Sequence, residues 1–549
     1  MSSLRPDGHN FSRRCMLRWT TTAAAGVFAP RLAVAVERAG ALEHGAISGE
    51  PTAEKAGVQV LASGGNVVDA VVAAALTAAV ASPHNSGIGG YGGHMTIALA
   101  NREVTSIDFN SAAPATARAD MFAADERAGS NAMQFGWLAA GVPGVLAGMQ
   151  FALDRFGTRS FREVVAPAIE LARTGFKLTP GLAKTMAGCA GQFRNDEGSR
   201  KLFLKGDKPL APGGIFRNPG LAAMLDTLAQ RDSVDSFYRG DIAQRIADAF
   251  KKNGGLVTAQ DLAAYRAREV EPLTLTWRGF DIRTAPLTAG GLTVLQSLAV
   301  LRALEGDKFP ADFTRTHARI EALRFAWHDR LALLGDPEKT EVPVAKLLSS
   351  EYAGEAAEQI RCVVKEKRFL EFQTESRPQP GTIHLSAADK QGNMAACTLT
   401  HGGSFGSRVT VNGLGLTLGH GMSRFERRPG HPNSPGPGKR PLHNMCPTIV
   451  LREGRPVLAV GARGGRQIPN AVFAVLAEFV GLGHTMTEAV DAPRIHTEGN
   501  VDLTVEKAWP ASALEPLNAI GYKIKTAPGA TVSAVSFDPQ SNTSRSAVR

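Results

Sequence analysis

A threonine that follows a glycine, Gly381-Thr382, has the clearest chemical potential in this chain. A threonine hydroxyl is a weak nucleophile until a base removes its proton. If the chain were cut between these residues, Thr382 would carry both a hydroxyl and a free α-amine, whose pKa lies near 8. That amine can act as base for its own hydroxyl, as in a Thr–N-terminal nucleophile. The alternative is that Thr382 opens a β-strand and has only a structural role.

The residues after Thr382 predict a β-hairpin that would place this threonine at the start of a strand. Apolar and polar residues alternate from Thr382 to Ala388, which is typical of a strand. The sequence Asp389-Lys390-Gln391-Gly392-Asn393 has the composition of a turn. Met394 to Thr400 then predicts the return strand.

The rest of the chain predicts layers of helices and strands. Residues 53–82 predict helix, and its second part, Val67 to Val80, is apolar on nearly all sides and must be buried. Pro447 to Gly461 predicts a second hairpin that turns at Glu453-Gly454, followed by a helix from about Gln467 to Val480. Further helices are expected within 141–155, 158–174, 235–254, 291–304 and 316–334. Strand pairs followed by helices at both ends of the chain indicate stacked α and β layers.

Three segments resemble the γ-glutamyltranspeptidase family: GTIHLSAADKQGNMAACTLTHGGSFG (381–406), GKRPLHNMCPTIV (438–450) and GARGGRQIPNAVF (461–473). The resemblance covers nearly all of residues 40–530. It implies an α+β fold, the four-layer αββα sandwich of N-terminal-nucleophile hydrolases. It also implies a precursor that cuts itself between Gly381 and Thr382, giving a large subunit, 36–381, and a small subunit, 382–549. The implied chemistry is hydrolysis or transfer of the acyl group of γ-glutamyl or related amides through an acyl-threonine, with water or an amine as acceptor and no cofactor.

Two further features are expected to support this chemistry. Gly464-Gly465 stands between a predicted strand and a predicted helix N-terminus, where backbone amides can bind an anion; the resemblance implies that this pair forms the oxyanion hole. The resemblance also places Thr400 on the threonine that hydrogen-bonds the nucleophile. His384 matches a histidine common in the family, and the sequence leaves open whether its role is structural or catalytic.

The residues that hold the γ-glutamyl group in the family are replaced in this chain. The resemblance implies an Arg and two Ser for the α-carboxylate, and an Asp, an Asn and a Gln for the α-amine. The substrate-binding positions are here occupied by Asn110 (for Arg), His443 and Asn444 (for the two Ser), Arg424 (for Asp), Gly402 (for Asn) and Gly421 (for Gln).

The exchange of an Asp for Arg424 changes the sign of the local charge. Two unit charges about 4 Å apart interact by roughly 4 kcal/mol at an effective dielectric constant near 20. Attraction for an ammonium group therefore becomes repulsion, and we expect glutathione to be a poor substrate. Arg424, with His443, is expected to hold a carboxylate instead, which favours an amide of a glutaryl or other dicarboxylic acyl group.

Other activities are compatible with the same residues. They are true γ-glutamyl transfer or glutathione hydrolysis, cephalosporin-acylase-like deacylation, and attack on γ-linked polymers or cell-wall amides. A non-catalytic periplasmic binding relative belongs to a different class of protein. The Gly381-Thr382 pair argues against it, because a binding protein has no need of a self-cleavage site.

Composition excludes several classes of partner. The 549 residues are 44% apolar and 20% charged, and the net charge is +10. No run of five or more Lys/Arg occurs, so a nucleic-acid partner is not expected. The sequence contains no apolar run of 18 residues, so a membrane span is not expected. Neither the Cys nor the His residues are spaced as metal ligands, so no metal is expected.

The N-terminal residues 1–35 predict an export signal. Ser12-Arg13-Arg14-Cys15-Met16-Leu17-Arg18 resembles a twin-arginine motif, and Ala33-Val34-Ala35 offers a cleavage site. The mature protein is therefore expected in the periplasm or outside the cell. The alternative is a disordered basic tail.

Overall fold

The computed structural model describes residues 36–38, 44–100, 104–123, 131–305, 313–372, 374 and 381–549. The predicted export signal, residues 1–35, lies outside these residues. None of the helices in the described part of the chain is long and apolar enough to cross a membrane.

The strand that follows Thr382, β12 (Ile383–Asp389), belongs to a six-stranded antiparallel sheet. The predicted hairpin is confirmed, because β12 pairs with β13 (Met394–Thr400) and Ile383 lies opposite Leu399. On its other side β12 pairs with β2 (Gly45–Ser48). The sheet continues beyond β13 with β3 (Gly92–Ala98), β4 (Thr105–Asp108) and β9 (Arg268–Val270).

A seven-stranded antiparallel sheet contains the second predicted hairpin, β16 (Thr448–Arg452) and β17 (Arg455–Arg463). Its turn is at Glu453 and Gly454, whose φ angles are 51° and 75°; two positive values are typical of a tight hairpin turn. The other strands of this sheet are β1 (Val36–Arg38), β22 (Thr543–Val548), β21 (Thr531–Asp538), β11 (Phe280–Thr284) and β10 (Leu273–Trp277).

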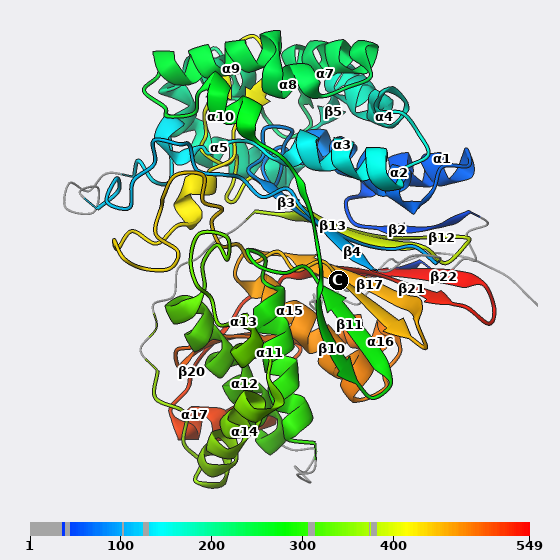
Figure 1. Cartoon of the computed structure of the whole chain (residues 1–549), viewed down its shortest axis with the longest axis vertical. Helices are drawn as coiled ribbons and strands as arrows, with labels where there is room; N and C mark the ends of the chain where they lie inside the picture. The colour runs from blue at the N-terminus through cyan, green and yellow to red at the C-terminus, as the bar shows by residue number, and fades with distance from the viewer. Residues whose placement is uncertain are drawn as a thin grey trace, which may run out of the picture. The chain divides into compact units, whose positions relative to one another are not determined.

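The two sheets stack face to face, with helices covering both outer faces (Figure 1). Small side chains fill much of the space between them, including Ala388 and Ala396 of the first sheet and Ala459 of the second. Ten helices lie on the side of the six-stranded sheet: α1 (Pro51–Ala62), α2 (Val67–Ala81), α3 (Val145–Phe156), α4 (Phe161–Thr174), α5 (Pro180–Arg194), α6 (Glu197–Phe203), α7 (Pro219–Arg231), α8 (Asp235–Arg239), α9 (Asp241–Lys252) and α10 (Ala259–Ala264) in the described part of the chain.

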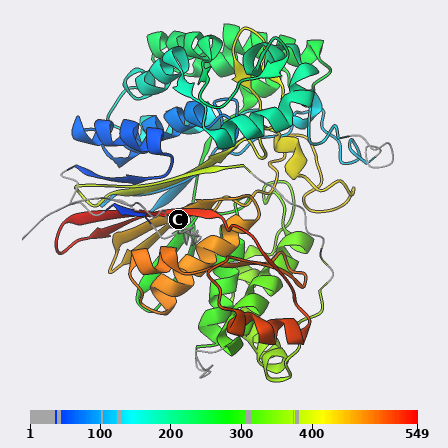
Figure 2. The ribbon, with the colours of Figure 1, turned by 180° about the vertical axis from the view of Figure 1, so that it is seen from behind.

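The helices on the other side cover the seven-stranded sheet (Figure 2). They are α11 (Gly291–Ala303), α12 (Phe313–Leu333), α13 (Val344–Leu347), α14 (Ser350–Lys365), α15 (Gln467–Leu476), α16 (Met486–Asp491) and α17 (Ala511–Ile520). Short strands complete the described chain: β5 (Phe176–Lys177), β6 (Leu204–Lys205), β7 (Lys208–Pro209), β8 (Ile215–Phe216), β14 (Thr410–Val411), β15 (Leu416–Thr417), β18 (Ile495–His496), β19 (Asp502–Val505) and β20 (Lys523–Thr526). The expected α+β fold, a four-layer αββα sandwich, is confirmed.

Helix α2 is the buried apolar helix that the sequence predicts. Every residue from Val67 to Val80 is buried. Asn66 caps the helix by accepting hydrogen bonds from the amides of Val68 and Asp69, and the Asp69 carboxylate accepts one from the Asn66 amide. This reciprocal cap satisfies helix-end amides that would otherwise be buried without partners. Helix α2 packs against β12, so the strand after Thr382 is covered on its outer face.

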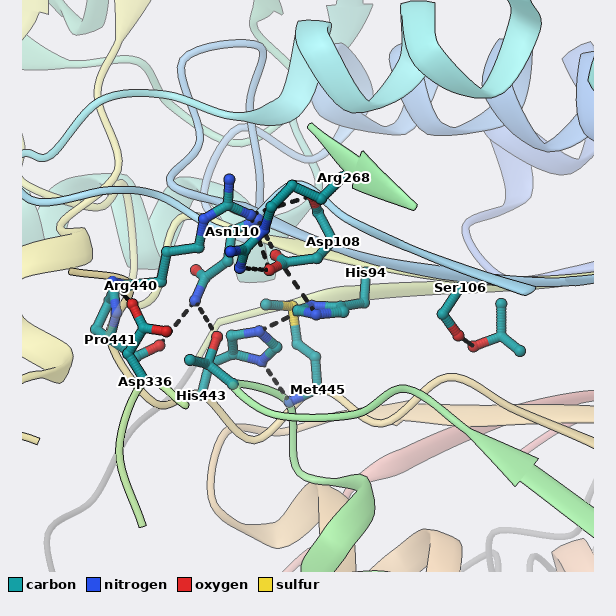
Figure 3. A network of polar contacts seen from close by, with 12 residues as sticks. His94, Ser106, Asp108, Asn110, Arg268, Asp336, Arg440, Pro441, His443 and Met445 are labelled. Atoms are coloured by element: carbon teal, nitrogen blue, oxygen red, sulfur yellow. Dashed lines mark hydrogen bonds and ion pairs between the residues drawn. The ribbon is translucent and has the colours of Figure 1, made fainter. Parts of the chain in front are cut away.

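A buried carboxylate, Asp108 at the end of β4, ties the first sheet to the loop before β16 (Figure 3). Its Oδ2 atom lies 2.8 Å from Arg440 Nη1 and 2.6 Å from Arg268 Nη2, and its Oδ1 lies 3.4 Å from His94 Nε2. Burial alone raises the pKa of Asp108, but the positive charges of Arg440 and Arg268, together with the nearby His94, outweigh it and hold this pKa well below its usual range. The ionised carboxylate therefore fixes Arg440, and with it the start of the loop 440–444.

We expect Asp108→Asn to lower the free energy of unfolding by about 3–5 kcal/mol near pH 7, because it leaves the buried Arg440 without its ion-pair partner. The folded-state pKa of Asp108 is depressed, so its contribution is present above the unfolded pKa near 4 and is lost as pH falls below it. Urea denaturation of wild type and variant between pH 3 and 7 measures the difference, which should shrink in acid.

Asp120→Asn is the matched control, because Asp120 pairs with Arg118 on the surface, where both side chains are exposed. Exposed pairs contribute about 0–1 kcal/mol. An Asp108→Asn effect no larger than that of the control would contradict the proposed role of Asp108 in the fold.

Candidate active site

Thr382 is buried at the start of β12, and its hydroxyl contacts the carbonyl oxygen of the residue before it. Thr382 Oγ1 donates to Gly381 O and lies 3.2 Å from Thr400 Oγ1. Thr400 Oγ1 in turn donates to Gly381 O over 3.0 Å and accepts a hydrogen bond from Gly402 N over 2.7 Å. Two hydroxyls therefore converge on a single backbone carbonyl.

Gly381 has a backbone conformation that only glycine adopts easily. Its φ is 98°, and a Cβ atom added here would lie 3.0 Å from the carbonyl carbon of Gly403. Both the left-handed φ and the close approach exclude a larger residue. The glycine therefore lets the chain bring the Gly381 carbonyl to the two hydroxyls.

Gly464 and Gly465 lie between β17 and α15, as the sequence predicts. Their φ angles are 140° and 63°. Their carbonyl oxygens accept hydrogen bonds from the amides of Gln467 and Ile468, and neither glycine amide has an acceptor among the described residues. Two unoccupied amides at a helix N-terminus can bind an anionic oxygen.

The glycine turn follows the part of β17 that packs on β12 beside Thr382. A Cβ at Gly461 of β17 would lie 2.2 Å from the ring of His384, two residues after Thr382. Farther along the same strands, Ala459 and Ala388 belong to one buried cluster. The glycine turn and Thr382 therefore lie at the same end of the two sheets.

A pocket of about 910 Å³ opens beside the loop 402–404. Three of the predicted substrate-binding residues, Gly402, Arg424 and Asn444, line it. Gly402 has a φ of 95°, and a Cβ here would lie 2.3 Å from the His420 ring. The absence of a side chain at residue 402 thus makes room for His420, which also lines the pocket.

The other three predicted substrate-binding residues lie outside the lining of this pocket. Asn110 is fully buried, and its Nδ2 donates to Thr288 Oγ1 and to Pro441 O, both over 2.7 Å. A Cβ at Gly421 would lie 2.7 Å from Ser111 Oγ, so this glycine is packed against its neighbours.

His443 is also buried, and both of its ring nitrogens have protein partners. Its Nε2 lies 3.0 Å from His94 Nδ1, and its Nδ1 accepts from Met445 N over 3.2 Å (Figure 3). Burial, together with His94, lowers the pKa of His443 well below its usual range. The ring is therefore neutral at physiological pH, and its hydrogen-bonding capacity is used within the protein.

His384 lies between the two sheets. Its Nδ1 is 2.7 Å from Thr398 Oγ1 and its Nε2 is 2.9 Å from Ser386 Oγ. Burial lowers its pKa to about 3. A Cβ at Gly461 of β17 would lie 2.2 Å from the His384 ring, so the second sheet packs directly on it. These contacts favour the structural alternative for His384.

Sequence reasoning missed three side chains that line the pocket, Trp327, Arg330 and Arg466. Trp327 and Arg330 lie one turn apart on α12, and Arg466 directly follows the Gly464-Gly465 pair. Both guanidinium groups lie over the Trp327 ring, 5.6 Å (Arg330) and 5.8 Å (Arg466) from its centroid. The position of Arg466 beside the glycine turn is the one signal in the sequence that could have identified it.

Comparison with known proteins places this geometry in a family. The family model described as gamma-glutamyltranspeptidase matches residues 53–549. A glutathione hydrolase proenzyme of Escherichia coli (strain K12) is 36% identical over 512 residues, covering 88% of this chain and 86% of that protein. An acylase ACY 1 proenzyme of Pseudomonas sp. (strain SE83) is 34% identical over 506 residues, covering 90% of this chain and 89% of that protein.

Solved structures agree with these matches. The crystal structure of cephalosporin acylase from Bacillus halodurans superposes with a TM-score of 0.82 at 27% identity, covering 92% of this chain and 93% of that one. Gamma-glutamyltranspeptidase from Helicobacter pylori gives a TM-score of 0.53 at 34% identity, covering 57% of this chain and 90% of that one. The chain therefore belongs to the gamma-glutamyltranspeptidase family, and it is an N-terminal-nucleophile enzyme of the hydrolase and acyltransferase type.

Proposed function

We propose that this protein is a precursor that cuts itself between Gly381 and Thr382 and then uses Thr382 to hydrolyse or transfer the acyl group of an amide. The observation that carries the proposal is the contact between the Thr382 hydroxyl and the Gly381 carbonyl, with the Thr400 hydroxyl donating to the same oxygen. A nucleophile must lie within reach of the carbon that it attacks. The contact of the Thr382 hydroxyl with the Gly381 carbonyl oxygen supports such an attack before any cut is made.

Self-cleavage follows from these groups in two steps. Thr382 Oγ attacks the Gly381 carbonyl carbon, and negative charge develops on the oxygen that Thr400 contacts. The peptide C–N bond breaks as the Thr382 nitrogen takes a proton, which leaves an ester between Gly381 and the Thr382 hydroxyl. Water then hydrolyses this ester, releasing the Gly381 carboxylate and a Thr382 that carries both its hydroxyl and a free amine.

Turnover of a substrate repeats the same chemistry. The Thr382 amine, with a pKa near 8, takes the proton of its own hydroxyl as the hydroxyl attacks the substrate amide. The amides of Gly464 and Gly465 stabilise the oxyanion, and each such donor contributes about 3 kcal/mol in a well-studied protease. The acyl-threonine that forms is released by water or by an amine acceptor. No step needs a cofactor.

The two products of cleavage, 36–381 and 382–549, are expected to remain one intertwined domain. The six-stranded sheet takes β12 and β13 from the small chain and its other four strands from the large chain. Separating the chains would expose both edges of this hairpin. The relatives from E. coli and Pseudomonas sp. are both named proenzymes. Export by the predicted twin-arginine signal would place the folded protein in the periplasm or outside the cell.

The acyl group is proposed to end in a carboxylate, as in a glutaryl amide. Arg424 lines the pocket beside Gly402, where it can hold an anion and repels an ammonium group. The side-chain amide nitrogen of Asn110 and both ring nitrogens of His443 are engaged within the protein. A γ-glutamyl group would therefore meet repulsion at its amine and few free donors at its α-carboxylate.

Cephalosporin-acylase-like deacylation is the second candidate function. It is favoured by the TM-score of 0.82 against the acylase from Bacillus halodurans and by the similarity to the Pseudomonas acylase. Both candidates use the same nucleophile and differ in the amine that leaves.

Self-cleavage is tested by the intact mass of purified wild type, Thr382→Ala and Thr382→Ser. We expect wild type to give two fragments, the smaller beginning at Thr382, because the hydroxyl attacks the preceding carbonyl. Thr382→Ser should also be cut, and Thr382→Ala should stay whole. Thr448→Ala is the control, because Thr448 is another buried threonine that opens a strand; it should be cut as in wild type. An uncut wild type would favour the non-catalytic binding relative.

Thr400→Val should slow self-cleavage by about 10²–10³-fold, because it removes a donor to the Gly381 oxygen, on which charge develops in that step. The shape of the side chain is kept, so the fold should be preserved. Thr398→Val on the same strand is the matched control, since its hydroxyl contacts His384 instead. Equal cleavage rates in the two variants, followed by gel analysis over time, would rule out this role for Thr400.

The acyl preference is tested by kcat/KM for glutaryl, γ-glutamyl and butyryl p-nitroanilides. We expect the glutaryl compound to be preferred, and Arg424→Gln to reduce its kcat/KM by about 10- to 100-fold, as expected when a hydrogen bond to a charged group is lost. The uncharged butyryl compound should change little. Arg428→Gln is the control, because this arginine is exposed and lies outside the pocket lining. Turnover of the γ-glutamyl compound equal to or above that of the glutaryl compound would contradict the proposed acyl group.

A further inference from the structure

Two arginines in the pocket carry charges that no described carboxylate neutralises. Arg330 on α12 is 3% exposed, and its Nη2 donates to His443 O over 2.7 Å and to Asn444 Oδ1 over 3.2 Å. Arg424 donates to Gly402 O, and its buried Nε atom has no acceptor among the described residues. Neutral oxygens satisfy individual donors of these groups, but they leave the positive charges uncompensated.

A further cation in the same pocket, Arg466, already has a counter-charge. Its Nη1 lies 2.6 Å from Glu498 Oε2. Burial and the charge of Arg466 lower the pKa of Arg330 to about 10, and burial and Arg466 also lower the pKa of Arg424. Arg466 therefore lies close enough to repel both of the other guanidinium groups, and its own positive charge is paired with Glu498.

The described carboxylates that line the pocket do not pair with Arg330 or Arg424. The Glu426 carboxylate accepts from the backbone amides of Arg427 and Arg428, 2.9 Å and 3.3 Å away. Asp502 accepts from Asn500 Nδ2 over 3.4 Å and is exposed. If Arg330 only held the backbone of residues 443–444 in place, its hydrogen bonds would be explained. Such a structural role does not explain why its positive charge lies in the same pocket as those of Arg424 and Arg466.

We infer that Arg330 and Arg424 form a two-anion subsite, so that the acyl group of the preferred substrate carries two distal carboxylates rather than one. The inference rests on the proposed function, because it takes this pocket as the acyl-binding site. Guanidinium groups bind carboxylates through paired, charge-assisted hydrogen bonds. Two uncompensated guanidinium groups that line one partly buried pocket match two carboxylates carried by one short acyl chain.

The test uses free acids, each of which has one carboxylate more than the acyl group that it mimics. Glutarate represents an acyl group with one distal carboxylate, and propane-1,2,3-tricarboxylate represents one with two. Isothermal titration calorimetry on the purified full protein at pH 7.5 measures their binding without turnover. We expect the tricarboxylate to bind about tenfold more tightly than glutarate, a difference of about 1.4 kcal/mol.

Variants assign the preference to the two arginines. Arg330→Lys and Arg424→Gln should each reduce the tenfold preference to about threefold or less, and Arg428→Gln should leave it unchanged. Arg330→Lys keeps a positive charge and is chosen in case loss of the buried charge prevents folding; a lysine cannot reproduce the paired donors of arginine. Arg424→Gln is independent of Arg330 and tests the second half of the subsite.

The outcomes separate this inference from the proposed function. Equal or weaker binding of the tricarboxylate by wild type would overturn the two-anion subsite, whatever the result with glutaryl p-nitroanilide. A retained preference in both Arg330→Lys and Arg424→Gln would overturn it as well. Tight tricarboxylate binding by a protein that is never cut at Thr382 would support the subsite while contradicting the proposed enzyme mechanism.

Discussion

The register of the β12–β13 hairpin is the constraint on which the geometry around Thr382 depends. Ile383 lies opposite Leu399, so Thr382 and Thr400, which extend this register, come face to face. A slip by one residue would turn every side chain of β12 to the opposite face. Both faces of β12 are buried, one against α2 and the other against β17 and β21. Burial on both sides therefore fixes the register, and the register fixes the distance between the two hydroxyls.

The arginines of this protein show how one residue type serves two purposes. Arg268 and Arg440 both contact the buried Asp108 carboxylate, and Arg268 also pairs with Glu338, so two carboxylates balance their charge within the protein. That balance holds the loop 440–444 in place. Arg330 and Arg424 stand near the other end of the same loop, and their partners are backbone carbonyls and a side-chain amide oxygen. Their charge is left for a ligand to balance, which is why we assign the first pair to the fold and the second to binding.

The parts of the structure that depend on local sequence could be predicted. Alternating residues and turn composition predict both hairpins, and the Ala/Val-rich run predicts the buried helix α2. The meeting of Thr382 with Thr400 also follows from local pairing. The pocket could not be predicted to the same extent. Arg330 donates a hydrogen bond to Asn444, which is more than a hundred residues away in the sequence. Asn110 donates one to Pro441, which is more than three hundred residues away. Such contacts depend on how the layers stack, and no pattern within one segment encodes them.

This difference explains why the two halves of the site can change independently. The residues proposed for bond cleavage lie on one hairpin and one strand-to-helix turn, and both are fixed by buried backbone pairing. Many of the side chains that line the pocket come from α12, from the loop after β13, from the segment 421–425 and from the loop before β16, and Arg466 reaches it from beside the glycine turn. Under the proposed function, exchanging charges among these pocket side chains would alter the preferred acyl group without moving Thr382. A chain of this family would then keep its nucleophile while arginines take over the recognition of the acyl group.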